Sequence, residues 1–373
     1  MVPKGKSQPE PALIGTLKPA KILDFSIPVN PLGPSKKAER KLKTGLSAAL
    51  RYPDPRGGDL IKTLAQFHGI SEEEILLGAG AIEFLHGIPR ALSLRRALMV
   101  TPISAEHERA LETMGPPQKP QIDYFETREE DGFELDVNGL ISALTLGYDA
   151  LYLSNPGFPT GILTSKEDLF RVLAQTERHQ TWFILDETSI DFVEEQSLKE
   201  RGNTSSRLLI LRSFSNFFAI PGLQVGYLLG NREAIQKVRN AVPPLTVHAL
   251  GEIAAAESLR DPVHIRRTKE WVPKERERLA QGLRSIPGFV PYPGAANFLF
   301  VQLLPLLGID GKDLSEELLR QEMRIDDCRS YRLLGPDFVS IALRTRRENN
   351  LLLKALRRIV ANLPSLPNAS QSG

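Results

Sequence analysis

The feature that most constrains this fold is the alternation of short apolar runs with helical segments between about residues 57 and 245. The apolar runs lie at 75–77, 97–100, 150–154, 181–185 and 208–211. Runs of this length bounded by turn residues predict buried strands. Strands separated by helices pair in parallel through right-handed crossovers. The sequence therefore predicts an α/β fold with a mainly parallel, helix-covered sheet.

Composition narrows the possible functions. A chain of 373 residues with 41% apolar content is long enough for two packed domains. Its 47 basic and 45 acidic residues leave a net charge of +2, which argues against nucleic-acid binding. No run approaches the roughly 20 apolar residues that span a membrane. Cys328 is the only cysteine, which fits a reducing compartment, so we expect a cytoplasmic protein.

The stretch 211–227 carries the strongest local signal. Two hydroxyls, Ser213 and Ser215, follow a predicted strand and precede an aromatic-rich turn. This stretch resembles the active-site segment of the fold-type I pyridoxal-phosphate (PLP) enzymes, which reads Arg-Ser-x-x-Lys, with an arginine eight residues after the lysine. The nearest branches are threonine-phosphate decarboxylase and histidinol-phosphate aminotransferase. Asn216 stands at the lysine position and Gln224 at the arginine position.

These two departures change the chemistry that the resemblance implies. The family lysine forms a Schiff base with the PLP aldehyde and then carries a proton. The asparagine amide at Asn216 has no basic lone pair, so it can neither condense with an aldehyde nor act as a base. Gln224 offers the PLP phosphate only neutral hydrogen bonds, which are roughly half as strong as those of an arginine.

Motifs in the first hundred residues extend the resemblance. The passage 24–34 is similar to the family's DFSxNxNPLGP segment, which lines the substrate pocket and places Asn30 there. Residues 51–55 are similar to the family's RYPDP element. The resemblance implies that Tyr52 reaches a cofactor phosphate in the partner subunit, although a tyrosine packed in an ordinary turn would give the same sequence. Gly78, Ala79 and Gly80 occupy the place of the family's phosphate cup, where backbone amides at a helix N-terminus approach the phosphate.

Three central motifs supply the expected ring contacts. His107 stands where the family has an aromatic residue stacked on the pyridine ring, and a solvent-facing helix histidine is an equally good interpretation. The motif NPNNPTG aligns with 155–161, which keeps Asn155 but has Phe158 in place of the asparagine that donates to the phenolic oxygen. Asp186, in a segment like LDEAFIDF, matches the carboxylate that pairs with the pyridinium nitrogen. It is also explained as a strand-end cap.

Two motifs near the end of the chain point to the substrate. The segment 292–300 is similar to the family's YPGxANYLL, with Asn297 at the substrate-facing asparagine. Arg344 follows an apolar strand and matches the arginine that binds the substrate carboxylate, for which a bidentate guanidinium is suited. Read without the resemblance, Arg344 is an ordinary surface arginine.

The resemblance implies a fold-type I PLP-transferase (aspartate-aminotransferase-like) with a seven-stranded-type sheet in a large domain and a small α+β domain. We expect the boundaries to be as follows: a flexible segment at 1–21, an N-terminal segment packing with the small domain at 22–50, the large domain at 51–245, the small domain at 246–361 and a disordered tail at 362–373.

Two interpretations of function follow. In the first, the chain is a relative that has lost lysine-dependent PLP catalysis and acts as a binding, scaffold or regulatory homodimer, with an amino-acid or phospho-amino-acid ligand. In the second, it is an active PLP-dependent aminotransferase or amino-acid decarboxylase using another base. Lys199 and Lys237 lie in the same domain but on no motif. Chemistry without PLP in the changed pocket is a third option. Ser189 is a further departure from the family, in which many members have an aromatic residue at this position. No group of histidine, cysteine or aspartate residues has the spacing of metal ligands.

Overall fold

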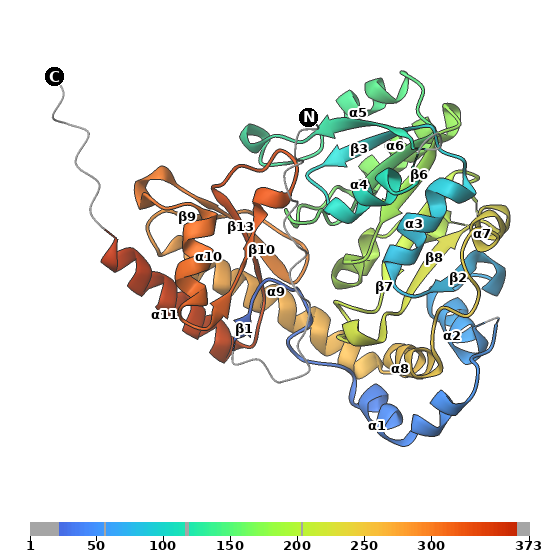
Figure 1. Cartoon of the computed structure of the whole chain (residues 1–373), viewed down its shortest axis with the longest axis horizontal. Coiled ribbons are helices and arrows are strands. Elements are labelled where there is room, and N and C mark those ends of the chain that lie inside the picture. Colours follow the sequence, from blue (N-terminus) through green and yellow to red (C-terminus); the bar gives the residue numbers. More distant parts are fainter. Residues whose placement is uncertain (1–21, 56, 116–118, 203, 364–373) are drawn as a thin grey trace, which may run out of the picture.

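A seven-stranded sheet forms the centre of the larger part of the molecule (Figure 1). The computed structural model describes residues 22–55, 57–115, 119–202 and 204–363. The strands lie in the order β2-β8-β7-β6-β5-β3-β4. Their bounds are β2 (Ile75–Gly78), β3 (Arg96–Thr101), β4 (Gln121–Glu126), β5 (Ala150–Ser154), β6 (Trp182–Asp186), β7 (Leu208–Ser213) and β8 (Gly226–Gly230).

The sheet is mainly parallel, which confirms the prediction. Strands β4, β3, β5, β6 and β7 pair in parallel, and β8 runs antiparallel to its two neighbours, β7 and β2. All five predicted apolar runs lie in strands of this sheet. Parallel pairing sends the ends of β5, β6 and β7 to one edge, and the polar residues that follow these strands therefore gather there.

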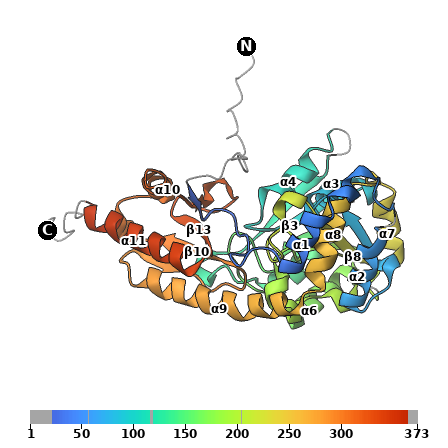
Figure 2. The ribbon, with the colours of Figure 1, turned by 90° about the horizontal axis from the view of Figure 1, so that it is seen from below.

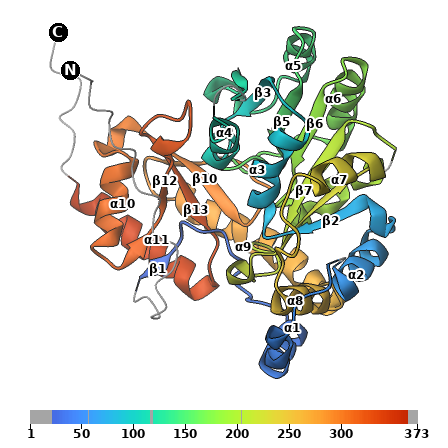
Figure 3. The same ribbon diagram turned by 45° about the vertical axis from the view of Figure 1, so that its right-hand side comes forward.

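Helices cover both faces of the sheet, as Figure 3 shows. One face packs against α3 (Ala81–Ala91), α4 (Ala105–Glu112) and α7 (Arg232–Arg239). The other face packs against α2 (Gly58–His68), α5 (Val137–Leu144), α6 (Lys166–Arg178) and α8 (Ala249–Leu259). Strands buried on both faces explain why the sequence shows continuous apolar runs rather than alternating ones.

Helix α6 illustrates how the sequence specifies these layers. Ser165 caps its first turn, and the Ser165 hydroxyl accepts a hydrogen bond from the Asp168 amide at 3.1 Å. The buried residues Leu169, Val172 and Leu173 recur at helical spacing. They place one apolar stripe against the sheet and leave the charged residues outside.

The smaller part of the molecule is built on a four-stranded antiparallel sheet in the order β12-β13-β10-β9. Its strands are β9 (Phe289–Pro291), β10 (Phe298–Leu303), β12 (Asp326–Asp327) and β13 (Phe338–Ala342). The helices of this part are α10 (Gly311–Leu319) and α11 (Arg346–Asn362). The long helix α9 (Pro262–Arg284) runs along both parts (Figure 2).

The N-terminal segment connects the two parts. Strand β1 (Leu23–Asp24) pairs in parallel with β11 (Met323–Arg324), whereas α1 (Lys36–Thr44) packs against α8. Helix α8 itself follows the predicted boundary at residue 245 but packs against α1 and α2.

The predicted flexible segment 1–21 lies outside the described residues. Helix α11 ends at Asn362, and the rest of the predicted tail beyond residue 363 also lies outside them. Among the described residues, no helix is long and apolar enough to cross a membrane.

Phe133 joins the two parts from the loop between β4 and α5. Its ring lies edge-on to three rings of the small sheet, with centroids 5.3 Å from Phe300, 5.4 Å from Tyr292 and 5.5 Å from Phe338. Phe133 has a φ of +61°, a left-handed conformation that is unfavourable for a bulky residue. Packing in the aromatic cluster therefore offsets local backbone strain.

We predict that Phe133→Ala lowers the free energy of unfolding by about 3–5 kcal/mol, because it removes a buried ring that joins the two parts. Urea unfolding followed by circular dichroism measures this change. Phe67→Ala serves as the control, since the Phe67 side chain is 36% exposed and its loss is expected to have a much smaller effect. Equal effects of the two substitutions would contradict the proposed contribution of the aromatic cluster.

Candidate functional site

The ends of β5, β6 and β7 bring three of the predicted residues to one edge of the sheet. Asp186 ends β6 and pairs in register with Ser154 of β5 and Leu211 of β7. The Asn155 amide donates to the Asp186 carbonyl at 2.8 Å. Ser213 ends β7. In open α/β sheets this edge is where ligands bind, so we take it as the candidate site.

The predicted phosphate cup lies beside Ser213. Ser213 pairs with Gly226 of β8, and a Cβ atom on Gly226 would lie 2.4 Å from the Gly80 carbonyl carbon and 2.5 Å from the Ala81 amide nitrogen. Only a glycine therefore allows β8 to pack this closely on the start of α3. Gly80, with a φ of +77°, begins α3 without a side-chain cap, so the first amides of the helix are available to an anion.

Gln224 lies at the same cup. Its side-chain oxygen would be 3.1 Å from a Cβ atom on Gly80, and its amide nitrogen donates to the Pro221 carbonyl at 3.0 Å. The residue itself is exposed and has a φ of +47°. The structure therefore places Gln224 beside Gly80, where it contributes a neutral amide and no positive charge.

Glu83 belongs to this cup, and the sequence analysis missed it. One of its carboxylate oxygens accepts a hydrogen bond from the Ala79 amide at 2.5 Å, and the other is buried without a hydrogen bond. The signal was available, because Glu83 stands three residues after the N-cap Gly80, the position from which a glutamate reaches back in a capping box. One cup amide is thus already bound to a carboxylate.

Asn216 lies in the loop that follows β7. The Ser215 amide donates to the Ser213 hydroxyl at 3.1 Å, which fixes the start of this loop. The Asn216 carbonyl accepts a hydrogen bond from the Asn30 amide at 2.8 Å. The Asn216 side chain is half-buried and forms no hydrogen bond with any residue in the described part of the chain.

Asn30 holds the N-terminal segment against this loop. Its side-chain amide donates to the Phe217 carbonyl at 2.8 Å and to the Thr268 hydroxyl at 3.0 Å. Its side-chain oxygen accepts from the Leu32 amide at 3.0 Å. Both ends of the Asn30 amide therefore form bonds within the chain, and its predicted contact with a substrate has no support in this geometry.

Asp186 is paired with His107. The His107 Nε2 atom lies 3.1 Å from an Asp186 carboxylate oxygen, and the other oxygen accepts from the Thr188 amide at 2.9 Å. Burial raises the pKa of Asp186, but the contacts with His107 and Thr188 outweigh burial and lower it below its usual value. His107 is 2% exposed, so the interpretation of a solvent-facing histidine is wrong.

Asn155 and Phe158 have structural contacts. The Asn155 amide donates to the Thr164 carbonyl at 3.1 Å and its oxygen accepts from the Thr164 amide at 2.8 Å, which closes the loop between them. The half-buried Phe158 ring lies edge-on to Phe298, at 5.2 Å, and to Tyr331, at 5.8 Å. Phe158 thus packs against residues of the small part.

Asn297 and Arg344 are adjacent and each has an unpaired atom. The Leu343 amide donates to the Asn297 carbonyl at 2.8 Å, and the Asn297 side-chain amide donates to the Pro28 carbonyl at 2.6 Å. The Asn297 side-chain oxygen and the Arg344 Nε atom are both buried without a hydrogen bond in the described part of the chain. Glu348 lies 3.5 Å from a terminal nitrogen of Arg344, whose side chain is 30% exposed.

Tyr52 is not brought to this site within one chain. Its side chain is 92% exposed, and it lines a cavity of about 460 Å³ together with Leu50, His248 and Leu250. Leu50, at 86% exposed, and Leu46, at 68% exposed, lie on the same short 3-10 helix (Leu46–Leu50). The predicted role of Tyr52 requires a second copy of the chain.

Comparisons with known proteins identify the family of the chain. The family model "Aminotransferase class I and II" matches residues 20–357. The chain belongs to the class I and II aminotransferase family. It is 33% identical over 360 residues to a threonine-phosphate decarboxylase of Salmonella typhimurium, with 95% of each chain covered.

Two solved structures show the same fold of this family. A histidinol-phosphate aminotransferase from Clostridium acetobutylicum superposes with a TM-score of 0.84 at 28% identity, covering 92% of this chain and 100% of that one. A histidinol-phosphate aminotransferase from Sinorhizobium meliloti, solved in complex with pyridoxal-5'-phosphate, superposes with a TM-score of 0.81 at 20% identity, covering 91% of each chain. Members of the aminotransferase family therefore bind PLP.

A buried cluster of charged residues adjoins the candidate site of this aminotransferase-family chain, next in sequence to Asp186 and Ser213. Arg212, fully buried on β7, donates to Glu187 at 3.0 Å, to Glu194 at 2.8 Å and to the Ser197 hydroxyl at 2.7 Å. Asp191 lies 3.4 Å from the same guanidinium. We call these five residues the Arg212 cluster. The sequence analysis passed over the cluster, although two of its acids stand within six residues of Asp186.

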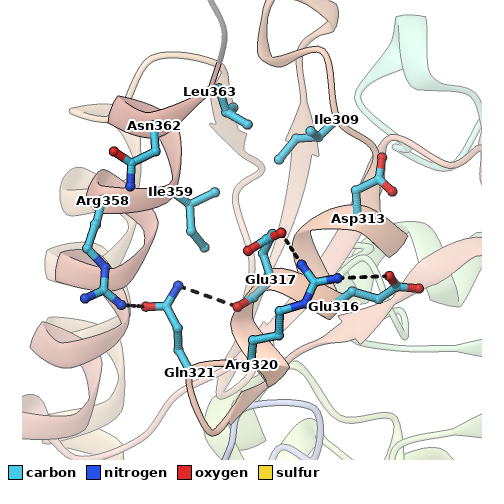
Figure 4. A pocket seen from close by; sticks show the side chains of 10 residues that line it. All are labelled: Ile309, Asp313, Glu316, Glu317, Arg320, Gln321, Arg358, Ile359, Asn362 and Leu363. Carbon is cyan, nitrogen blue, oxygen red and sulfur yellow. Dashed lines mark hydrogen bonds and ion pairs between the residues drawn. The ribbon is translucent and has the colours of Figure 1, made fainter.

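A second cavity, of about 340 Å³, lies between α10 and α11 (Figure 4). Its polar side chains pair with one another: Arg320 with Glu316 and Glu317, and Gln321 with Arg358. The cavity has no unpaired buried group to hold a ligand. Among the described residues, no group of three or more histidines, cysteines or acids could hold a metal ion.

We predict that Asp191 makes the stability of the Arg212 cluster pH-dependent. Burial, together with the charges of Glu194 and Glu187, raises the pKa of Asp191 to about 7, because these effects outweigh Arg212. A carboxyl whose pKa is raised on folding stabilises the fold at low pH and loses this contribution as the pH rises. The free energy of unfolding of the wild type, relative to Asp191→Asn, should therefore fall between about pH 4 and about pH 7.

Urea unfolding of both proteins near pH 5 and near pH 8 tests this prediction. Asp131→Asn is the control, since Asp131 is exposed and lies outside the Arg212 cluster. A wild-type minus Asp191→Asn difference that stays the same at the two pH values would show that Asp191 is ionised throughout.

Proposed function

We propose that this chain is a threonine-phosphate-decarboxylase-like member of the aminotransferase family that has lost lysine-dependent PLP catalysis and acts as a binding or regulatory protein. The observation that carries the proposal is Asn216, whose carboxamide stands in the loop after Ser213 and Ser215 without a hydrogen-bond partner among the described residues. An amide at this position can neither hold an aldehyde covalently nor move a proton.

Neither Lys199 nor Lys237 replaces the missing amine. Lys199 binds Glu194 at 2.6 Å and belongs to the surroundings of the Arg212 cluster. The Lys237 ammonium lies over the Trp182 ring at 5.4 Å. Trp182 begins β6 and Asp186 ends it, so this ammonium lies near the opposite end of a strand that is about 13 Å long at its usual rise.

The residues present do not fit PLP as the family holds it. Covalent attachment needs an amine, and Asn216 supplies none. The phosphate cup keeps the uncapped start of α3, but its Ala79 amide already donates to Glu83, and the Gln224 amide stands in place of a guanidinium. Charged hydrogen bonds contribute about 1.5–3 kcal/mol each, so losing them together removes a large part of the affinity for PLP. We therefore derive no chemical step through this cofactor.

Two groups of residues would instead hold a ligand directly. The first amides of α3, which have no side-chain cap, and the hydroxyl groups beside them offer a phosphate neutral donors without the charged contact of a guanidinium. The unpaired Arg344 Nε atom and the unpaired Asn297 oxygen suit the carboxylate and the amino group of an amino acid. A phospho-amino acid carries all three groups, and the relative from Salmonella typhimurium is named for threonine phosphate. We propose this class of ligand, bound without chemistry.

We further propose a homodimer as the assembled form. The exposed side chains of Leu46, Leu50 and Tyr52 form an apolar surface on one short segment, which a second copy of the chain would cover. Tyr52 would then reach the cup of the partner subunit, as the resemblance implies.

The second candidate function is an active PLP-dependent aminotransferase or decarboxylase that uses a different base. Asp186, whose pKa is lowered, favours it, because such an enzyme would keep a carboxylate to pair with the ring nitrogen of PLP. The unpaired Arg344 nitrogen also favours it, because it could bind the carboxylate of the substrate. It requires an amine that the described contacts do not provide.

Borohydride reduction separates the two functions. We predict that the purified full-length protein mixed with PLP shows no lysine-aldimine absorbance band and that mass spectrometry finds no pyridoxyl group on a specific lysine after reduction. A stoichiometric pyridoxyl-lysine at a single position would overturn the proposal and favour the second candidate. A protein denatured before PLP is added shows the background labelling of surface lysines.

Restoring the lysine alone should not restore turnover. We predict that Asn216→Lys gives no decarboxylation of threonine phosphate and no transamination of histidinol phosphate above background, because Phe158 and Gln224 remain in place of a donor and a cation. The triple variant with Phe158→Asn and Gln224→Arg is the matched comparison. Robust turnover by Asn216→Lys alone would show that these two positions matter little.

A further inference from the structure

His107 is a buried residue whose ring contacts groups of its own chain. It lies in the first turn of α4 and is 2% exposed. Its Nδ1 atom lies 3.2 Å from the Ser104 carbonyl oxygen, and its Nε2 atom lies 3.1 Å from the carboxylate of Asp186. The ring is edge-on to Tyr152, with centroids 6.4 Å apart. Both ring nitrogens thus face oxygen atoms of the same chain.

Each oxygen of the Asp186 carboxylate already has a contact within the chain. One oxygen accepts from the Thr188 amide and the other faces the His107 Nε2 atom. The Nε2 atom of His107 is not aligned for a regular hydrogen bond, and its contact with Asp186 is defined by the 3.1 Å distance between the two atoms. Since Asp186 is 9% exposed as a residue, water screens this pair only weakly.

We propose that His107 supplies from within the chain the group that Asp186 pairs with, so that the site discriminates against ligands carrying a protonated ring nitrogen. The inference rests on the proposed function, because it takes this edge of the sheet as the ligand site. A ligand with such a nitrogen would need either to displace His107 or to share the carboxylate of Asp186 with it. Both alternatives are unfavourable in a buried site.

The physical consequence is a preference between two ligands that share a phosphate. Pyridoxamine 5'-phosphate carries a ring nitrogen that a free Asp186 would bind. O-phospho-L-serine carries a phosphate, an amino group and a carboxylate but no ring. His107 is expected to weaken the binding of the first and to leave the second unchanged, because only the first competes for the carboxylate.

His107→Phe tests the proposal, because it removes both ring nitrogens and keeps an aromatic ring at the same place. In titration calorimetry with the purified full-length protein, we expect this variant to bind pyridoxamine 5'-phosphate about tenfold more tightly than the wild type, the change that one competing contact of ordinary strength gives. Its affinity for O-phospho-L-serine should be unchanged. In the double variant His107→Phe/Asp186→Asn the gain should disappear.

A structural role for His107 gives a different result. If His107 only supports the fold, His107→Phe weakens both ligands or neither, and the proposal is overturned. It is also overturned if the variant shows no binding of pyridoxamine 5'-phosphate at all. Circular dichroism and thermal melting establish that the variant is folded. If it is not folded, His107→Gln provides a neutral replacement, for which we expect a smaller gain in the same direction.

This test is independent of the borohydride experiment. A pyridoxyl-lysine in the wild-type protein would refute the proposed function, whatever His107→Phe does. An unchanged ligand preference in His107→Phe would refute the pairing inference and leave the proposed loss of the lysine standing.

Discussion

The fold and the site depend on the buried guanidinium of Arg212. Its bonds reach Glu187, which directly follows Asp186, and Glu194 and Ser197 farther along the same segment. Arg212 itself directly precedes Ser213. The cluster therefore ties the end of β6 to the end of β7, the two strands that present the candidate site. Removing one partner of such a buried network leaves an uncompensated charge, which typically destabilises a protein by about 3–5 kcal/mol.

The large sheet was predictable because its physics is local. A parallel strand covered on both faces must be apolar along its whole length, and each such run was visible in the sequence. The contacts between the two parts were not predictable in the same way. Phe133 stands in a polar loop, and nothing near it in sequence indicates that its ring packs among Tyr292, Phe300 and Phe338. Long-range packing of this kind has no periodic signal.

For the candidate site, motif positions could be predicted but side-chain partners could not. The structure places Asp186, Ser213, Gln224 and the segment 78–80 at one edge of the sheet. It also pairs His107 with Asp186 and places Phe158 against the small part. A motif gives the backbone position of a residue. Which atom its side chain contacts depends on residues far away in sequence, and these can change while the backbone stays the same.

Retained motif residues are for this reason weak evidence of retained chemistry in this chain. Asn155 closes the loop to Thr164, Asn30 fixes the N-terminal segment to Phe217, and the Asn297 amide binds Pro28. Each of these asparagines would be kept by the requirements of folding alone, since a buried amide that loses its partner is costly. Asn216 is different, because its side chain forms no hydrogen bond with any described residue and the fold places no demand on it. Under the proposed function, a lysine at this position would be kept only by chemistry and would be free to change once that chemistry is not needed.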